Sequence, residues 1–349
     1  MYYDNQNPFG RDSYRDMMCK EAGRVFSRFH FGIVVYVVSA YVITILADVI
    51  LALFFKDSYA AIAENIYYQW VMGVFPMYLV GLPLLYLTVR TMPTRTLTKT
   101  KMPLGEFLIF FAIAQALMFI GNSIGTTLNE FFAVIKGDEI SNSTSELIEE
   151  SPVWITVLVA VIIGPIIEEF IFRKLLIDRL NQYGTVITVF VSGFSFGLFH
   201  GNFYQFFYAT LLGILLAYIT VKTGNWLYSV IMHIVINFFG SVAVLPIIEL
   251  SEKLTAELEG LAAGEAVDAV GILTSALAVI SYAVFEYGLV ISGLVLLFLA
   301  FKNKWYILRS TAEINIPRED YFRVVFSNAG TIVFILLSVA LFAISIFLG

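Results

Sequence analysis

The strongest constraint on this chain is a series of long apolar stretches separated by short polar ones. A helix needs about 20 mainly apolar residues to cross a bilayer. Nine segments come near or exceed this length, namely Phe31–Phe55, Tyr67–Val89, Leu104–Ile135, Val153–Phe172, Thr185–His200, Phe203–Val221, Trp226–Ile248, Gly271–Phe301 and Gly330–Leu348. Only Gly201-Asn202 separates the fifth from the sixth, so these two are either a pair of spans or one merged element, which would leave eight.

The composition excludes an ordinary soluble domain. Hydrophobic residues make up 59% of the chain and charged residues 14%, whereas soluble domains are about half apolar and about a quarter charged. We therefore predict an all-α fold, a polytopic integral membrane bundle of about nine transmembrane helices. The lipid bilayer is then an obligatory partner, and we expect no nucleic acid partner. Cys19 is the only cysteine, so an internal disulfide is excluded.

The positive charges divide between the two sides of this arrangement. Of the 21 lysines and arginines, only Lys56, Lys136 and Lys253 fall outside the segments that nine crossings place on one side. Positively charged loops stay in the cytoplasm, so we predict a cytoplasmic N-terminus and an external C-terminus. The positive-inside bias and the short loops fit a bacterial plasma membrane, which is the location we expect.

A pair of carboxylates lies inside the fourth span, in Gly164-Pro-Ile-Ile-Glu168-Glu169-Phe-Ile-Phe-Arg173. Ionisable groups inside a membrane are costly and therefore need a partner or a role. Glu169 and Arg173 are four residues apart and share a helix face, where they can pair. Glu168 points about 100° away from that face. One carboxylate is thus neutralised, and the other remains available as a general base.

Two further motifs place histidines at a compatible depth, Phe196-Gly-Leu-Phe-His200 in the fifth span and His233-Ile-Val-Ile-Asn237 in the seventh. If the fourth and fifth helices turn near Gly184, Glu169 and His200 lie about 21 and 25 Å from that turn, at 1.5 Å per residue. The same rise places His233 about 13 Å in from Gly224. The depths agree if the tip of the hairpin between the fourth and fifth helices projects about 10 Å into the cytoplasm. The sequence therefore predicts one site below the cytoplasmic surface.

Each motif alone also has a purely structural interpretation. Glu169–Arg173 can be a structural ion pair, and His200 can be a helix-packing histidine. His233 and Asn237 can be hydrogen-bonding contacts between helices. The third histidine, His30, we interpret as interfacial. Only the co-occurrence of the three motifs on consecutive apolar segments favours a functional site.

Together the three motifs resemble the CAAX-protease and bacteriocin-processing family of intramembrane proteases, also called the Abi family. The resemblance covers about Val153–Gly240. It implies that Glu168 and His200 activate a water molecule for attack on a peptide carbonyl, and that His233 and Asn237 stabilise the oxyanion. Glu169 and Arg173 would hold the site or bind the substrate, with Phe196 in a supporting role.

The resemblance leaves the metal question open. Glu168, His200 and His233 could make a three-ligand zinc site. A mechanism that uses only glutamate and histidine is also chemically complete, and we expect no cofactor.

We thus expect an intramembrane endopeptidase acting on a membrane-associated peptide or protein. One alternative is a non-proteolytic membrane protein on the same scaffold, such as a bacteriocin-immunity or cell-envelope factor. Another is an ion-coupled transporter, which buried carboxylates can also indicate. The expected organisation is a cytoplasmic segment 1–30, N-terminal transmembrane helices 31–135, a catalytic core 153–248, and C-terminal transmembrane helices 271–349 with a cytoplasmic loop 302–328.

Overall fold

The computed structural model is a bundle of helices, and no strand occurs in the residues that it describes, which are 11–264, 266–304, 314 and 316–348. Residues 1–10 of the predicted N-terminal segment lie outside the described residues. So do the predicted loop residues 305–313 and 315, together with Glu265 and Gly349.

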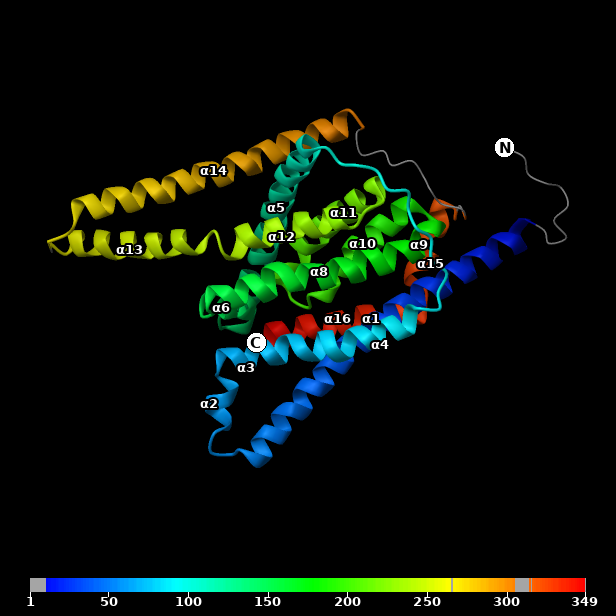
Figure 1. Cartoon of the computed structure of the whole chain (residues 1–349), viewed down its shortest axis with the longest axis horizontal. Helices are drawn as coiled ribbons and strands as arrows, with labels where there is room; N and C mark the ends of the chain where they lie inside the picture. The colour runs from blue at the N-terminus through cyan, green and yellow to red at the C-terminus, as the bar shows by residue number, and fades with distance from the viewer. Residues whose placement is uncertain (1–10, 265, 305–313, 315, 349) are drawn as a thin grey trace.

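The N-terminal half consists of two very long helices and, between them, a short helix followed by one interrupted helical rod (Figure 1). The elements are α1 Arg11–Phe54, α2 Tyr59–Ala63, α3 Ile66–Phe75, the π-helical turn η1 Pro76–Gly81, α4 Leu82–Val89 and α5 Leu104–Lys136. The predicted cytoplasmic segment and first span are one continuous helix, α1.

The middle of the chain contains the predicted site. Its elements are α6 Ser143–Glu149, α7 Val153–Ile155, η2 Thr156–Ile163, α8 Gly164–Glu169, η3 Phe170–Leu175, α9 Leu176–Leu180, η4 Asn181–Tyr183, α10 Thr185–Phe199, α11 Phe203–Thr223 and α12 Leu227–Ser241. The stretch α7–η4 is one helical rod whose two π-helical turns, η2 and η3, flank the short α8. Pro165 lacks an N–H and its ring crowds the preceding turn, which accounts for the widening before α8.

The C-terminal part adds α13 Leu245–Ala262, α14 Ala269–Lys302, η5 Arg318–Asp320, α15 Tyr321–Phe326 and α16 Ala329–Phe347. Helices α13 and α14 form a long antiparallel hairpin that projects from the bundle, and α16 lies against α1 (Figure 1).

The polytopic membrane fold is confirmed. Eight helical stretches in the described residues are long and apolar enough to cross a membrane. The predicted fifth span is α10, a separate helix of 15 residues. It does not merge with α11, because Gly201 adopts a positive φ of 66° and Asn202 caps the next helix by accepting a hydrogen bond from the Gln205 N–H. At about 1.5 Å per residue α10 is only about 22 Å long, so its turn lies within the thickness of a bilayer.

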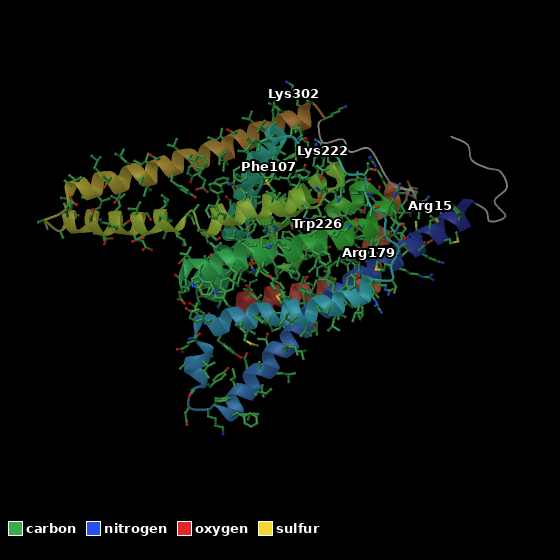
Figure 2. The ribbon with its side chains drawn as sticks, in the orientation of Figure 1. Arg15, Phe107, Arg179, Lys222, Trp226 and Lys302 are labelled. Atoms are coloured by element: carbon green, nitrogen blue, oxygen red, sulfur yellow. The ribbon has the colours of Figure 1, made fainter. Side chains whose placement is uncertain are left out.

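The two ends of the bundle differ in charge. At the end that we call the basic end, the start of α1 meets η5 through the Arg15–Asp320 hydrogen bond, and Lys222 on α11 pairs with Glu106 on α5. Figure 2 labels Arg15, Arg179, Lys222 and Lys302, all of which lie away from the tip of the α13–α14 hairpin. The opposite end, which we call the acidic end, holds α2, α6 and the α10–α11 turn, where the Tyr204 hydroxyl donates to the Ile140 carbonyl.

The region after Glu169 differs from the projecting hairpin tip that the sequence suggests. Arg179 and Asn181 are buried, and Arg179 donates to the carbonyls of Val89 and Leu175. The segment between α4 and α5 lies against this region, and its Arg95 N–H donates to the Asp178 carbonyl. The tip is thus packed into the basic end instead of standing free in the cytoplasm.

Candidate active site

The centre of the site is a buried chain of charges that joins two helices, the α7–η4 rod and α12. The Arg173 Nε lies 3.0 Å from Glu169 Oε2, and both side chains are fully buried. The N–H of Arg173 does not point at that oxygen, so this contact is an ion pair and not a well-aligned hydrogen bond. The other Glu169 oxygen, Oε1, lies 3.0 Å from His233 Nδ1. Glu169 therefore neutralises Arg173 and fixes the ring of His233, and its burial keeps it from any substrate.

Glu168 is the carboxylate that solvent and substrate can reach. Its Oε2 lies 3.7 Å from His233 Nε2, and its side chain is 24% exposed. Glu168 and Glu169 are adjacent on α8 and so point to different faces. The His233 ring consequently lies between the two glutamates, with Nδ1 towards Glu169 and Nε2 towards Glu168.

His200 presents one free ring nitrogen. Its Nδ1 lies 2.8 Å from the Phe196 carbonyl, which can only accept, so Nδ1 is the protonated nitrogen. In the neutral ring Nε2 is then an acceptor, and no described residue forms a hydrogen bond with it. A base in this orientation can hold or deprotonate a water molecule.

The Phe196 ring separates and orients the charged groups. It meets His200 and His233 edge-on, with ring centroids 4.8 and 5.7 Å away. The Arg173 guanidinium lies over the same ring at 4.6 Å from its centroid. Both imidazoles and the arginine thus take their positions from one buried aromatic side chain.

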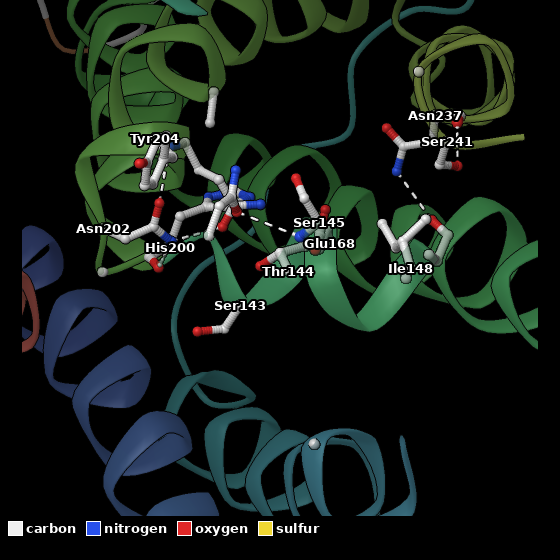
Figure 3. Close-up of a pocket in the computed structure, with 18 of the residues that line it drawn as sticks. Ser143, Thr144, Ser145, Ile148, Glu168, His200, Asn202, Tyr204, Asn237 and Ser241 are labelled. Atoms are coloured by element: carbon white, nitrogen blue, oxygen red, sulfur yellow. Dashed lines mark hydrogen bonds between the residues drawn. The ribbon is translucent and has the colours of Figure 1, made fainter. Parts of the chain in front are cut away.

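These side chains converge on one cavity of about 1300 Å³, which Figure 3 shows in close-up. Glu168, His200 and His233 all line it, together with Asn237. The predicted motifs of the fourth, fifth and seventh spans are therefore brought together. Glu169 and Arg173 lie behind the cavity wall.

Comparisons with known proteins agree with this arrangement. The profile of the type II CAAX prenyl endopeptidase Rce1-like family matches residues 150–239, the stretch that contains all three motifs. This match covers about a quarter of the chain and supports its similarity to the CAAX-protease and bacteriocin-processing family. It is also similar to the Bacillus subtilis (strain 168) protein named "Putative membrane peptidase YdiL", with 24% identity over 211 residues, 58% of this chain and 86% of that protein. No solved structure matches this chain.

One predicted member of the CAAX-protease site takes an unexpected position. His233 and Asn237 share a face of α12, but Asn237 Nδ2 donates to the Ala160 carbonyl at 3.0 Å. Ala160 lies in η2, where the π-helical turn presents its carbonyl to α12. One amide N–H of Asn237 is thus committed to the backbone, and the second N–H and the oxygen remain for the cavity.

Tyrosines next to the CAAX-protease motifs are site residues that sequence reasoning missed. Tyr36, Tyr78 and Tyr208 line the cavity with Glu168. They come from α1, η1 and α11. Aromatic residues are frequent in membrane helices, so no spacing or neighbour in the sequence distinguishes these three from lipid-facing tyrosines.

In the described part of the chain, no three His, Cys, Asp or Glu side chains are grouped closely enough to hold a metal ion. Of the zinc ligands considered above, His233 has Nδ1 committed to Glu169 and His200 has Nδ1 committed to the Phe196 carbonyl. This leaves Nε2 of each ring as the nitrogen that could bind a metal. The mechanism proposed below uses no metal.

Proposed function

We propose that this chain is an intramembrane endopeptidase that hydrolyses a peptide bond of a membrane-associated protein or peptide. Similarity to a CAAX-type protease family supports the reaction class. The observation that carries the proposal is the convergence of Glu168, His200 and His233 on one cavity at membrane depth. An ion-coupled transporter could also use buried carboxylates and imidazoles, but the match to a CAAX-type endopeptidase family favours peptide hydrolysis.

The proposed roles of the residues are based on this geometry. A water molecule bound between Glu168 and His200 Nε2 loses a proton to the carboxylate as its oxygen attacks the peptide carbonyl. The carbonyl oxygen becomes an oxyanion, which the free Asn237 N–H can stabilise as a donor. His233 Nε2 can donate as well when the ring is an imidazolium, because Nδ1 already donates to Glu169. Glu168 then delivers the proton to the leaving amine, so the site returns to its starting state.

The distribution of the basic residues supports one orientation in the membrane. We infer that the basic end faces the cytoplasm of a bacterial plasma membrane, with the N-terminus inside. Lys56, Lys136 and Lys253 are then the only described basic residues near the outer face.

The decisive test is Glu168→Gln, which keeps the shape of the side chain and removes the base. We expect cleavage to fall at least about 100-fold, the usual size of a general-base contribution, with an unchanged melting temperature. The matched control is Glu150→Gln on the exposed outer loop, which should cleave normally. A substrate found by membrane proteomics and still cut by Glu168→Gln would contradict the role.

The metal-free mechanism makes a separate prediction. Dialysis of the purified protein against a strong chelator should leave cleavage within about twofold, because no step uses a Lewis acid. Elemental analysis of the active protein should find far less than one zinc per chain. Loss of activity that returns on adding Zn²⁺ would refute the mechanism.

A further inference from the structure

The cavity extends from the site in only one direction along the bundle. In the α10–α11 hairpin the described lining residues begin at Phe196, pass round the turn and end at Leu212. In α12 they begin at His233, so the first six residues of that helix, 227–232, lie outside the lining. In each case the lining half is the half nearer the acidic end.

The other helices repeat this division. The lining of α5 begins at Gln115, and that of α16 consists of Leu341 and the residues after it. The helix α6, which lies at the acidic end, contributes Ser143 and Thr144 to the same cavity (Figure 3). Glu168 and His233 therefore form the floor of the cavity, and its mouth lies at the acidic end.

Below this floor the bundle is closed by a packed core. Phe172, Leu176, Leu216 and Met232 are fully buried between the site and the basic end, as is Arg173. Side chains packed at native density leave no room for a peptide. A substrate that reached Glu168 from the basic end would have to displace this core.

The charge of the cavity restricts what can enter. Among its described lining residues the only charged groups are Asp48, Glu168 and Glu286, and no lysine or arginine lines it. Asp48 accepts a hydrogen bond from the Tyr68 hydroxyl at 2.5 Å, which holds it in the wall. Away from bulk water, like charges repel strongly and an unpaired acidic residue is costly to bury.

We propose that the substrate segment enters from the acidic end, which is the outer face of the membrane in the orientation inferred above, and that this segment is neutral or basic. This inference rests on the proposed function for the identity of the substrate as a peptide. The direction of access and the preference for cations rest on the cavity alone, so they can be tested separately.

The test uses the single native cysteine. On a Cys19→Ser background, Gln115→Cys places a thiol at the floor and Thr96→Cys places an exposed one at the basic end. Ser345→Cys on α16 is a second cavity position if the first variant folds poorly. Each is treated with a cationic trimethylammonium-ethyl or an anionic sulfonatoethyl methanethiosulfonate, in intact cells and in inverted vesicles.

We expect the cavity thiols to react in intact cells, and the Thr96→Cys thiol to react only in inverted vesicles. For each thiol we take the ratio of its reaction rate with the cationic reagent to its rate with the anionic reagent. This ratio for a cavity thiol, divided by the same ratio for the exposed Thr96→Cys thiol, should be at least about 10. Asp48→Asn with Glu286→Gln should lower this ratio about fivefold, as expected for charges a few Å apart near a surface.

Two results would overturn the inference. Cavity thiols that react only in inverted vesicles would place the entrance at the basic end, and a normalised ratio of one or below would remove the preference for cations. Either result can coexist with an active peptidase, in which case the proposed function stands. If the cavity thiols react in intact cells but Glu168→Gln does not reduce cleavage, the inferred direction of access stands and the proposed function is wrong.

Discussion

At the scale of single residues, the site depends on polar groups that have no access to water. Glu169 and Arg173 are both fully buried, and each is the principal counter-charge of the other. Such a pair contributes little net stability, but loss of one partner leaves an uncompensated charge. The pair therefore fixes the position of His233 more than it strengthens the fold.

Arg173→Met tests this reasoning. We expect the variant to lose roughly 3–5 kcal/mol of stability, because Glu169 stays buried without its cation. The double variant Arg173→Met with Glu169→Leu should recover much of that loss in a thermal melt in detergent. Recovery of stability without recovery of cleavage is the expected pattern. Equal melting temperatures for the single variant and the parent protein would contradict it.

His30 is the second residue of this kind, and its interpretation as interfacial is wrong. It is 1% exposed, its Nδ1 lies 2.7 Å from the Thr331 hydroxyl and its Nε2 lies 2.9 Å from the Ser195 hydroxyl. The ring also stacks on Phe334 at 5.3 Å. His30 thus joins α1, α10 and α16 next to Phe196.

His30→Leu should cost about 1–3 kcal/mol, because two buried hydroxyls lose their partner. The triple variant with Ser195→Ala and Thr331→Val removes those hydroxyls as well and should restore much of the stability. Denaturation of the three proteins in one detergent measures this difference. A triple variant less stable than His30→Leu would show that the hydroxyls have other partners.

At the scale of elements, α10 and α11 approach closely because glycines line their contact. A Cβ on Gly213 would lie 2.9 Å from the Gly193 Cα, and a Cβ on Gly193 would meet the backbone of Ile214. Backbone atoms cannot move aside as a flexible side chain does. The short distance between these helices places Phe196 and His200 against α8 and α12.

Gly193→Ala should therefore push α10 away from α11, with a cost of roughly 1–3 kcal/mol for overpacking and a larger relative loss of cleavage. Gly288→Ala in α14 is the matched control, since a Cβ there meets nothing within 4 Å and Gly288 does not line the cavity. Melting temperature and cleavage rate are measured for both. A Gly193→Ala protein as active as the Gly288→Ala protein would show that the close approach is dispensable.

The elements also show how far the sequence could predict this protein. Apolar length predicted the spans, and the spacing of four residues predicted the Glu169–Arg173 pair. The contact of Asn237 with Ala160 could not be predicted, because it depends on the π-helical turn η2. The burial of His30 depends on Ser195 and Thr331, which lie far away in the chain. The pattern of apolar and polar residues along the sequence predicts neither contact.

At the scale of the whole molecule, the two ends of the described chain are joined at the basic end. Arg15 Nε donates to Asp320 Oδ2 at 2.6 Å, and Arg323 lies 3.0 Å from Asp16. The hydrogen bond from Arg15 holds the pKa of Asp320 below its usual value. These contacts connect α1 to the segment before α16, and so close the bundle around the site.

Because its pKa is lowered by folding, ionised Asp320 stabilises the fold at any pH above the pKa of an unfolded aspartate, about 3.9. This stability is lost as the pH falls through the lower pKa of the folded state. Asp320→Asn should therefore melt below the parent protein at pH 7, and the gap should close well below pH 4. Asp16→Asn is the control, because its pair is exposed and should contribute little. A gap that stays constant with pH would contradict the assignment.

The short helix α10 has one more consequence. Its turn ends within the hydrocarbon layer, which is about 30 Å thick, and the cavity beside it is large enough to hold water at that depth. A protease can attack a membrane helix only after the backbone hydrogen bonds around the scissile bond have opened, and such opening is very unfavourable in lipid. Water in a recess inside the membrane would lower that barrier. The short length of α10 sets the depth of this recess, and so sets how far a target helix must leave the lipid before the target unwinds.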